Sequence, residues 1–182
     1  MGLRPGRIVR EINKQAWARF SKKKPRKSYV KSMPHNAIQI TSMGIQHGYY
    51  TMRVDLVATR PIQIRDNSIE AARQAANKYL EAKMLGRYHL FLRVFPHHVI
   101  REIRMVFGAG ADRIQKGMKH AWGKPSDRAA RMYPGSVFMT ARVLEADIPH
   151  VKEAYRRAKN KLSGSYAIKV AEDIVGTPPV EE

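Results

Sequence analysis

Residues 49–57, with the sequence YYTMRVDLV, alternate between apolar and polar side chains. From Tyr50 onwards every second position is apolar, and the positions between them hold Thr51, Arg53 and Asp55. Because successive side chains of a β-strand point to opposite faces, this pattern predicts a strand with one buried face. Such a strand needs neighbouring strands to pair with and a layer of other elements packed on its apolar face. The flanking segments therefore decide the fold.

Further strands and two helices are predicted on either side of it. Residues 88–95 (YHLFLRVF), 136–144 and 166–170 have strand patterns, and residues 37–40 and 99–104 have weaker ones. Apolar side chains recur at helical spacing in residues 68–84 and 148–162. Asn67 is expected to cap the first helix, in a capping box with Glu70, and Asp147 the second. The order strands, helix, strands, helix, strand predicts an α+β domain with a mixed or antiparallel sheet and two amphipathic helices.

The charge of the chain indicates its class of partner. Among 182 residues there are 34 Lys and Arg against 15 Asp and Glu, a net charge of +19. Such an excess repels itself in a compact fold, and a polyanion relieves that repulsion by neutralising it. The composition therefore favours nucleic acid as the partner over an anionic membrane surface.

The charge is also unevenly distributed along the chain. Residues 1–31 hold eleven Lys and Arg and one acid, residues 100–142 hold nine against three, and residues 172–182 hold four acids and no base. This distribution predicts three parts: a basic, RNA-binding N-terminal arm (1–36), a single α+β domain with a glycine-rich basic loop at about 104–131 (37–171), and an acidic tail (172–182).

The glycine-rich stretch 107–125, FGAGADRIQKGMKHAWGKP, was compared with nucleotide-binding loops. A Walker-type loop needs four residues between its glycines and a hydroxyl after its lysine. Here five residues separate Gly117 from Gly123, and Pro125 occupies the hydroxyl position. A dinucleotide loop also fails, because Arg113 stands where the third glycine is required. The stretch is therefore predicted to contact phosphates without turning them over.

The sequence gives little support for catalysis, metal binding or membrane insertion. The chain has no Cys, which excludes disulfides and thiolate metal sites, and its seven His lack ligand spacing. No apolar run is long enough to span a membrane, and no signal peptide is evident. We therefore expect no catalytic residues, metal, cofactor, membrane contact or small-molecule substrate. A phosphate-handling enzyme that uses Asp112 or Asp127 is the weaker alternative.

The predicted RNA contacts are the basic residues of the arm and of the loop, together with two loop glycines that let backbone amides approach a phosphate. A plain solvated loop is the alternative for the second group, and residues 112–122 could form a short helix. The predicted RNA-binding residues are Arg4, Arg7, Arg10, Lys22, Lys23, Lys24, Arg26, Lys27, Arg101, Arg104, Gly108, Gly110, Arg113, Lys116, Lys119, Lys124, Arg128 and Arg131.

Five stretches resemble a known family: GLRPGRIVR near the start, NSIEAARQAANKYL, HLFLRVFPHHVIRE, GAGADRIQKGMKHAWGKP and VKEAYRRAKNKL. They are similar to the universal L-sixteen family of large-subunit ribosomal proteins, called L-ten-e in archaea and eukaryotes. The long form of the central block resembles the archaeal and eukaryotic members. Residues 11–24, 41–52 and 172–182 depart from the family pattern.

The resemblance implies an α/β-hammerhead fold and a structural role in the large subunit of cytoplasmic ribosomes. It implies binding to large-subunit rRNA and a position beside aminoacyl-tRNA near the peptidyl-transferase centre. Neighbouring ribosomal proteins and ribosome assembly factors are the other implied partners. A free-standing RNA-binding regulatory or assembly protein is the alternative, because the same basic surfaces would serve it.

Overall fold

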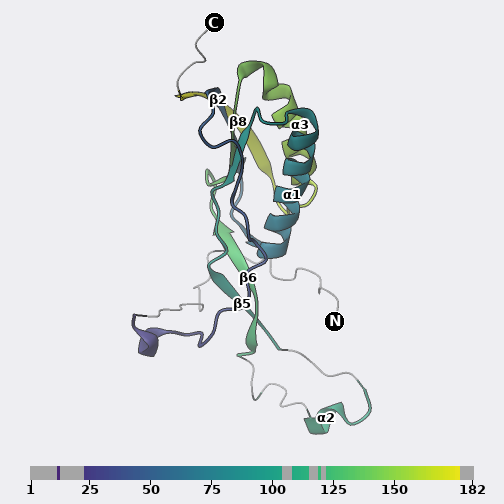
Figure 1. Ribbon diagram of the computed structural model, residues 1–182. Coiled ribbons are helices and arrows are strands. Elements are labelled where there is room, and N and C mark those ends of the chain that lie inside the picture. Colours follow the sequence, from purple (N-terminus) through teal and green to yellow (C-terminus); the bar gives the residue numbers. More distant parts are fainter. Residues whose placement is uncertain (1–11, 13–22, 104–107, 115–118, 120–121, 177–182) are drawn as a thin grey trace, which may run out of the picture.

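The computed structural model describes residues 12, 23–103, 108–114, 119 and 122–176 (Figure 1). The strands in this part of the chain are β1 (Ser42–Gly44), β2 (Tyr50–Ala58), β3 (Ile62–Arg65), β4 (His89–Leu92), β5 (His98–Glu102), β6 (Lys124–Met132), β7 (Val137–Val143) and β8 (Tyr166–Val175). The helices are α1 (Asp66–Lys83), α2 (Ala111–Ile114) and α3 (Ile148–Lys159), with 3-10 turns η1 (Pro25–Lys27) and η3 (Glu145–Asp147).

The strands form two antiparallel sheets. The larger sheet has the order β1-β4-β7-β2-β8, and the smaller has the order β3-β6-β5. In the described part of the chain, the backbone passes between the sheets four times, from β2 to β3, from β3 through α1 to β4, from β4 to β5 and from β6 to β7. The predicted α+β class is confirmed, and of the two sheet types allowed by the sequence the structure has the antiparallel one.

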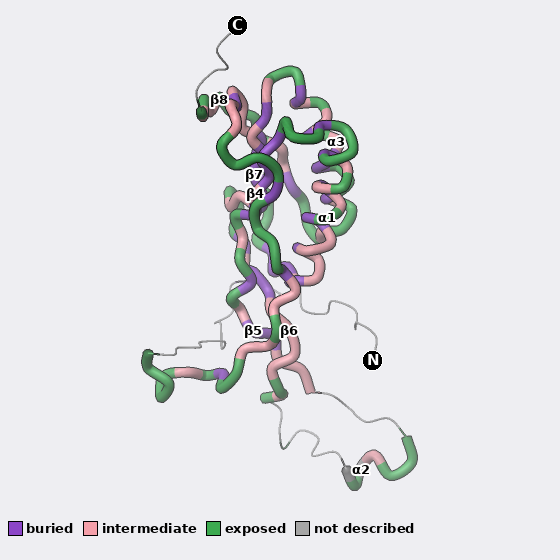
Figure 2. The backbone as a smooth tube through the Cα atoms, viewed as in Figure 1, coloured by how far each residue is buried: buried purple, intermediate pink, exposed green. Residues whose placement is uncertain are grey.

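The two longer helices cover one face of the larger sheet (Figure 1). Their inward stripes are rich in alanine: Ala72 and Ala76 on α1 and Ala154 and Ala158 on α3 have no exposed surface. Small side chains let a helix come close to the sheet, so Leu56, Leu80 and other large residues fill the space between the layers. The buried residues gather in this upper part of the molecule (Figure 2).

Tyr155 ties α3 to the middle of the larger sheet. Its side chain is fully buried, and its hydroxyl donates a hydrogen bond to the carbonyl oxygen of Val54 on β2 at 2.9 Å. Burial raises the pKa of Tyr155 well above the ordinary value for a tyrosine, so the hydroxyl keeps its proton and remains a donor. The bond thus joins the helix layer to the central strand.

The two faces of β2 differ from the simple expectation. Val54 and Leu56 are fully buried beneath the helices, as the alternation predicted. Asp55, on the opposite face, is also buried: it accepts a hydrogen bond from Thr140 of β7 at 2.7 Å and lies 3.2 Å from Arg53. β2 lies between β7 and β8, and the bond from Thr140 on β7 satisfies this carboxylate in the sheet.

Several predicted strand boundaries are corrected by the structure. Residues 37–40 are not a strand, and the nearby strand is β1 instead. Neither β3 nor β6 was predicted, whereas β5 matches the weak pattern at 99–104. β8 continues to Val175, so it includes Glu172 and Asp173 of the predicted acidic tail.

The predicted helix caps are wrong in detail. α1 begins one residue before Asn67, and the carboxylate of Asp66 accepts hydrogen bonds from the backbone N–H of Asn67 at 2.9 Å and of Ala37 at 3.0 Å. Asp147 makes no side-chain capping bond to α3 and instead lies 3.7 Å from Arg87. Asp66 therefore connects the helix start to a segment 29 residues earlier, a contact that local pattern does not reveal.

Replacing Tyr155 with Phe is expected to lower the free energy of unfolding by about 1–2 kcal/mol, because a buried hydrogen bond is lost. Tyr155→Ala should cost about 3–5 kcal/mol, because it also leaves a cavity. Urea denaturation followed by circular dichroism measures both. Tyr133→Phe, at a tyrosine that is 55% exposed, is the control and should change stability by less than about 0.5 kcal/mol. Equal effects of the two Phe variants would contradict the role given to the Tyr155 hydroxyl.

Candidate nucleic-acid interface

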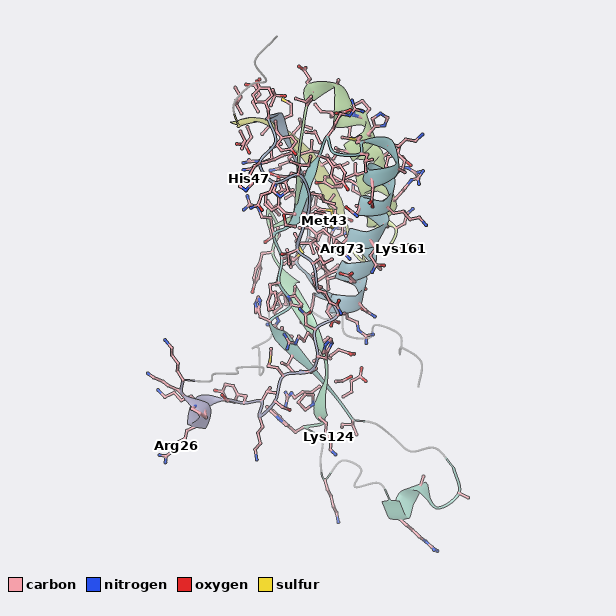
Figure 3. The ribbon with its side chains drawn as sticks, in the orientation of Figure 1. Arg26, Met43, His47, Arg73, Lys124 and Lys161 are labelled. Carbon is pink, nitrogen blue, oxygen red and sulfur yellow. The ribbon has the colours of Figure 1, made fainter. Side chains whose placement is uncertain are left out.

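The candidate interface lies on the β5–β6 ribbon, which extends from the smaller sheet away from the helices (Figure 1). β6 pairs with β3 through residues 129–132 and with β5 through residues 124–129, so its first half has a partner on one side only. The segment between β5 and β6, residues 103–123, is called the finger here, and α2 lies in it. Lys124 lies at the finger end of the ribbon (Figure 3).

The basic loop is shorter than predicted from the sequence. It was expected to run from about 104 to 131, but β6 begins at Lys124 and places Lys124, Arg128 and Arg131 on a strand. The sequence KPSDRAARM is polar and contains a proline, so its strand pattern is weak. Pairing with β3 and β5 therefore determines its conformation.

Arg128 helps to hold part of the predicted N-terminal arm. Its Nε donates a hydrogen bond to the carbonyl oxygen of Pro34 at 2.6 Å. Nearby, Val30 and Val99 are both 2% exposed and pack together with Met33. Residues 30–34 of the predicted arm therefore pack against the ribbon, and η1 lies on the outlying part of this segment (Figure 1).

Arg131 and Arg65 also make contacts within the protein. Arg131 donates to the side-chain oxygen of Gln63 at 3.3 Å and to the carbonyl oxygen of Ile12 at 3.5 Å. Arg65 forms an ion pair with Asp127, whose carboxylate also accepts a hydrogen bond from Ser126 at 3.3 Å. Asp127, one of the two carboxylates considered for phosphate chemistry, therefore serves as the ion-pair partner of Arg65 in this structure.

His98 lies in the smaller sheet as a neutral side chain. Burial, and then the nearby charges of Arg131, His97 and Arg101, lower its pKa from 6.5 to about 4. Desolvation and like charge both disfavour the protonated ring. His98 consequently adds no positive charge to the ribbon at neutral pH.

At the base of the finger, Arg101 and Trp122 are stacked. The guanidinium carbon of Arg101 lies 3.2 Å from the centroid of the Trp122 ring, and Trp122 is 52% exposed. The Nη1 atom of Arg101 is buried and has no hydrogen-bond partner in the described part of the chain. Burial lowers the pKa of Arg101. Trp122 was not among the predicted contacts, although a large aromatic residue between glycines and lysines is a signal that could have identified it.

Gly123 closes the base of the finger. Its φ is +67°, and a Cβ atom at this position would lie 2.8 Å from the carbonyl carbon of Glu102 and 2.9 Å from its oxygen. Such a contact is not tolerated, so the close approach of the two strands requires glycine here. Gly123 thereby constrains the backbone position of Trp122, the residue before it, relative to the ribbon.

The predicted RNA-binding residues differ in their exposure to solvent. Lys23, Lys24, Arg26 and Lys27 are exposed on and beside η1, and Gly108, Gly110, Arg113, Lys119 and Lys124 are exposed in and beside the finger (Figure 2). Arg101, Arg128 and Arg131 are half-buried. Figure 3 shows Arg26 on the outlying segment and Lys124 on the ribbon. Arg4, Arg7, Arg10, Lys22, Arg104 and Lys116 lie outside the described residues.

The face of the larger sheet opposite the helices carries a second basic cluster, which the sequence reasoning missed. The guanidinium carbons of Arg93 and Arg142 lie 4.8 and 5.6 Å from the centroid of the Phe91 ring. Arg142 also lies 3.2 Å from Asp173, and His89 stacks on Phe91 at 5.2 Å. The alternation at residues 89, 91 and 93 was a usable signal for this shared face.

The described residues contain no group of three or more His, Asp or Glu side chains arranged to hold a metal ion. None of their helices is long and apolar enough to cross a membrane.

Comparison with known proteins gives one consistent result. The family model described as Ribosomal protein L16p/L10e matches residues 17–169. Proteins named large ribosomal subunit protein uL16 match from Staphylothermus marinus (44% identity over 163 residues, 89% of this chain and 90% of that protein) and Thermofilum pendens (44% over 164 residues, 89% and 93%). The uL16 protein of Haloarcula marismortui is 38% identical over 175 residues, 93% of this chain and 95% of its own. The resemblance stated from the sequence motifs is confirmed.

Replacing Gly123 with Ala should open the finger end of the ribbon, because the new methyl group meets the backbone of Glu102. We expect faster amide hydrogen exchange in β5 and the first half of β6, and a loss of about 1–3 kcal/mol in local stability. Gly110→Ala is the control: its φ is also positive, but a Cβ there has no neighbour within 4 Å. Unchanged exchange in Gly123→Ala would contradict the tight closure.

His98 predicts a dependence of stability on pH. Its pKa in the folded protein lies below 6.5, so the unfolded chain binds the proton more readily. The contribution of His98 to stability is therefore complete above about pH 6.5 and is lost as the pH falls towards about 4. His98→Gln should flatten the curve of unfolding free energy against pH in this window. His35→Gln, at an exposed histidine that is not among the causes of the His98 shift, is the control, and a curve unchanged by the His98 substitution would count against this account.

Proposed function

The chain belongs to the ribosomal protein L16p/L10e family, and we propose that its arm and finger hold large-subunit rRNA and position aminoacyl-tRNA. The protein is a structural constituent of the large ribosomal subunit rather than an enzyme. Ribosomal RNA and other ribosomal proteins are its partners in that assembly. The residues that make these contacts, and the contact with tRNA, are the substance of the proposal.

The placement of exposed cations supports the RNA-binding role of the arm and finger. Two exposed basic groups lie on different branches of the molecule, one around η1 and one in and beside the finger (Figure 1). On α3, by contrast, Arg156 and Arg157 pair with Glu153 at 2.7 and 3.0 Å. Cations near the helices are thus partly neutralised within the protein, whereas the branches carry their charge outward, where a polyanion can reach it.

The backbone of the finger suits close approach to RNA. Gly108 and Gly110 have φ values of +139° and +76°, and a Cβ atom on either would have no neighbour within 4 Å. The backbone at both positions is open, so its amides can face a phosphate without side-chain obstruction. Double-stranded RNA is recognised mainly through phosphates, 2′-hydroxyls and shape, for which exposed Arg, Lys and backbone N–H groups are suitable donors.

The finer parts of the proposal are supported by family membership. They comprise the hammerhead type of fold, a basic N-terminal extension that lies on rRNA, a finger directed towards the peptidyl-transferase centre, and ribosome assembly factors as partners. Arg128 and Arg131, which contact Pro34 and Ile12, are proposed to position the arm in addition to binding RNA. Lys23, Arg26, Arg113 and Lys119, which are exposed, are proposed to contact phosphates directly.

Sedimentation tests the ribosomal assignment against a free-standing RNA-binding regulator. The tagged chain, expressed in a cell whose own copy has been removed, should sediment with large subunits at moderate salt in about one copy per subunit. A regulator would remain in the light fractions, and that result would overturn the proposal.

Salt dependence tests the role of the arm cations. Replacing Lys23, Lys24, Arg26 and Lys27 together with Gln should reduce the slope of log affinity against log salt by up to about 3.6 units for a large-subunit rRNA fragment, because each phosphate contact contributes about 0.9. Filter binding between low and physiological salt measures the slope.

A charge-matched variant makes this test specific. Lys78, Lys83, Lys152 and Lys161 are exposed on or near the helices, so replacing all four with Gln removes the same charge from the other side of the molecule. This control should leave the slope nearly unchanged. Equal losses in the two variants would mean that net charge, rather than the arm, governs binding.

A further inference from the structure

Trp122 is an exposed aromatic side chain on the basic ribbon, and the proposed function does not account for it. We propose that Trp122 is a stacking site for one unpaired RNA base, with Arg101 and Lys124 as the groups that hold the adjoining phosphate. The proposal rests on the proposed RNA-binding function and names a specific contact within it.

The first support is the arrangement of the ring itself. Trp122 is 52% exposed, although tryptophan side chains are highly buried on average. The guanidinium of Arg101 stacks on the ring with its central carbon 3.2 Å from the centroid. About half of Trp122 is exposed in addition to this contact, and nucleobases stack on exposed aromatic side chains.

The second support is that the position of the ring is fixed. Gly123, the next residue, passes so close to Glu102 that only a glycine with positive φ fits. In the pairing of β5 with β6, the next residue, Lys124, lies opposite Glu102, and Pro125 lies opposite Arg101. The backbone on the C-terminal side of Trp122 is therefore constrained, so a ligand would not have to order it on binding.

The third support is the charge beside the ring. Lys124 is exposed, and Arg101 is a half-buried cation whose Nη1 atom has no hydrogen-bond partner among the described residues. Burial lowers the pKa of Arg101, because desolvation disfavours a charged group. A phosphate group beside Lys124 and Arg101 would offset this desolvation cost through its opposite charge. Two acidic residues also lie in this ladder, Glu102 opposite Lys124 and Asp127 opposite Ile100.

Phe91 and Tyr133 differ from Trp122 in their surroundings. Phe91 has arginines on its ring at 4.8 and 5.6 Å, and it stacks with His89. Tyr133, which is 55% exposed, lies in the turn between β6 and β7, away from the finger end of the ribbon. Tyr133 therefore provides a matched control for an exposed aromatic residue outside the proposed site.

Fluorescence of the full-length chain can detect stacking directly. Trp17→Phe leaves Trp122 as the single tryptophan, and the probes are a short single-stranded oligoadenylate and inorganic polyphosphate of similar charge. Stacking predicts that oligoadenylate quenches the emission, whereas polyphosphate binds without comparable quenching because it has no bases. Equal quenching by both probes would overturn the proposal, since phosphate contact alone would then explain the signal.

Substitutions test the energetic role of the ring. Trp122→Leu should weaken oligoadenylate binding by about 10-fold or more, because loss of one base–aromatic stack has an effect of that order. Trp122→Phe, which keeps an aromatic ring, should recover much of the affinity, and Tyr133→Leu should change it little. The salt slope should be similar in all three variants, because no charge is removed.

The outcomes separate this proposal from the one on which it rests. A flat salt response of the parent chain would refute phosphate-led RNA binding itself. Normal salt-dependent binding with full affinity in Trp122→Leu would refute only the stacking site. If Trp122→Leu binds RNA normally but no longer sediments with large subunits, the ring contacts a protein instead, which also overturns the proposal. Thermal unfolding of each variant checks the fold, and Trp122→Phe preserves the test if the Leu variant is unstable.

Discussion

The pairing of β6 on both of its sides is the constraint on which the rest of the structure depends. Through β3 this strand is connected to α1 and the large core, and through β5 it extends the chain into a ribbon that carries the finger. Its ladder bonds hold Arg128 and Arg131 where they reach Pro34 and Ile12. One strand therefore attaches both the finger and part of the arm to the same frame.

The molecule separates apolar burial from positive charge. The large core lies between α1, α3 and the five-stranded sheet, where Ala72, Ala154 and their neighbours allow close packing. Acidic residues on the helices form ion pairs with nearby cations. On α3, hydrogen bonds from Arg156 and Arg157 lower the pKa of Glu153 to about 2. The exposed cations of η1 and the finger lie away from this core, so their mutual repulsion acts on branches that an RNA partner can neutralise.

Polar contacts between distant segments explain why local patterns identified the elements better than their ends. The carboxylate of Asp66 accepts hydrogen bonds from the backbone N–H groups of Asn67, in the first turn of α1, and of Ala37. The buried carboxylate of Asp55 accepts one from Thr140 on a neighbouring strand. The capping box expected at Asn67 was chemically reasonable, but it considered only neighbours along the chain. Trp122 was missed although its place between glycines and lysines was a usable local signal, and its contact with Arg101 became visible only in the structure.

The sequence by itself determined the α+β class, the two amphipathic helices, the main strands of the larger sheet, the basic character and the family. These features depend on periodicity, composition and motifs, which are properties of the chain and its near neighbours. Only the tertiary structure decided that KPSDRAARM is a strand, that Asp55 is buried and that Arg101 stacks on Trp122. Those outcomes depend on hydrogen bonds and desolvation between residues far apart in sequence, and such contacts exist only after the chain has folded.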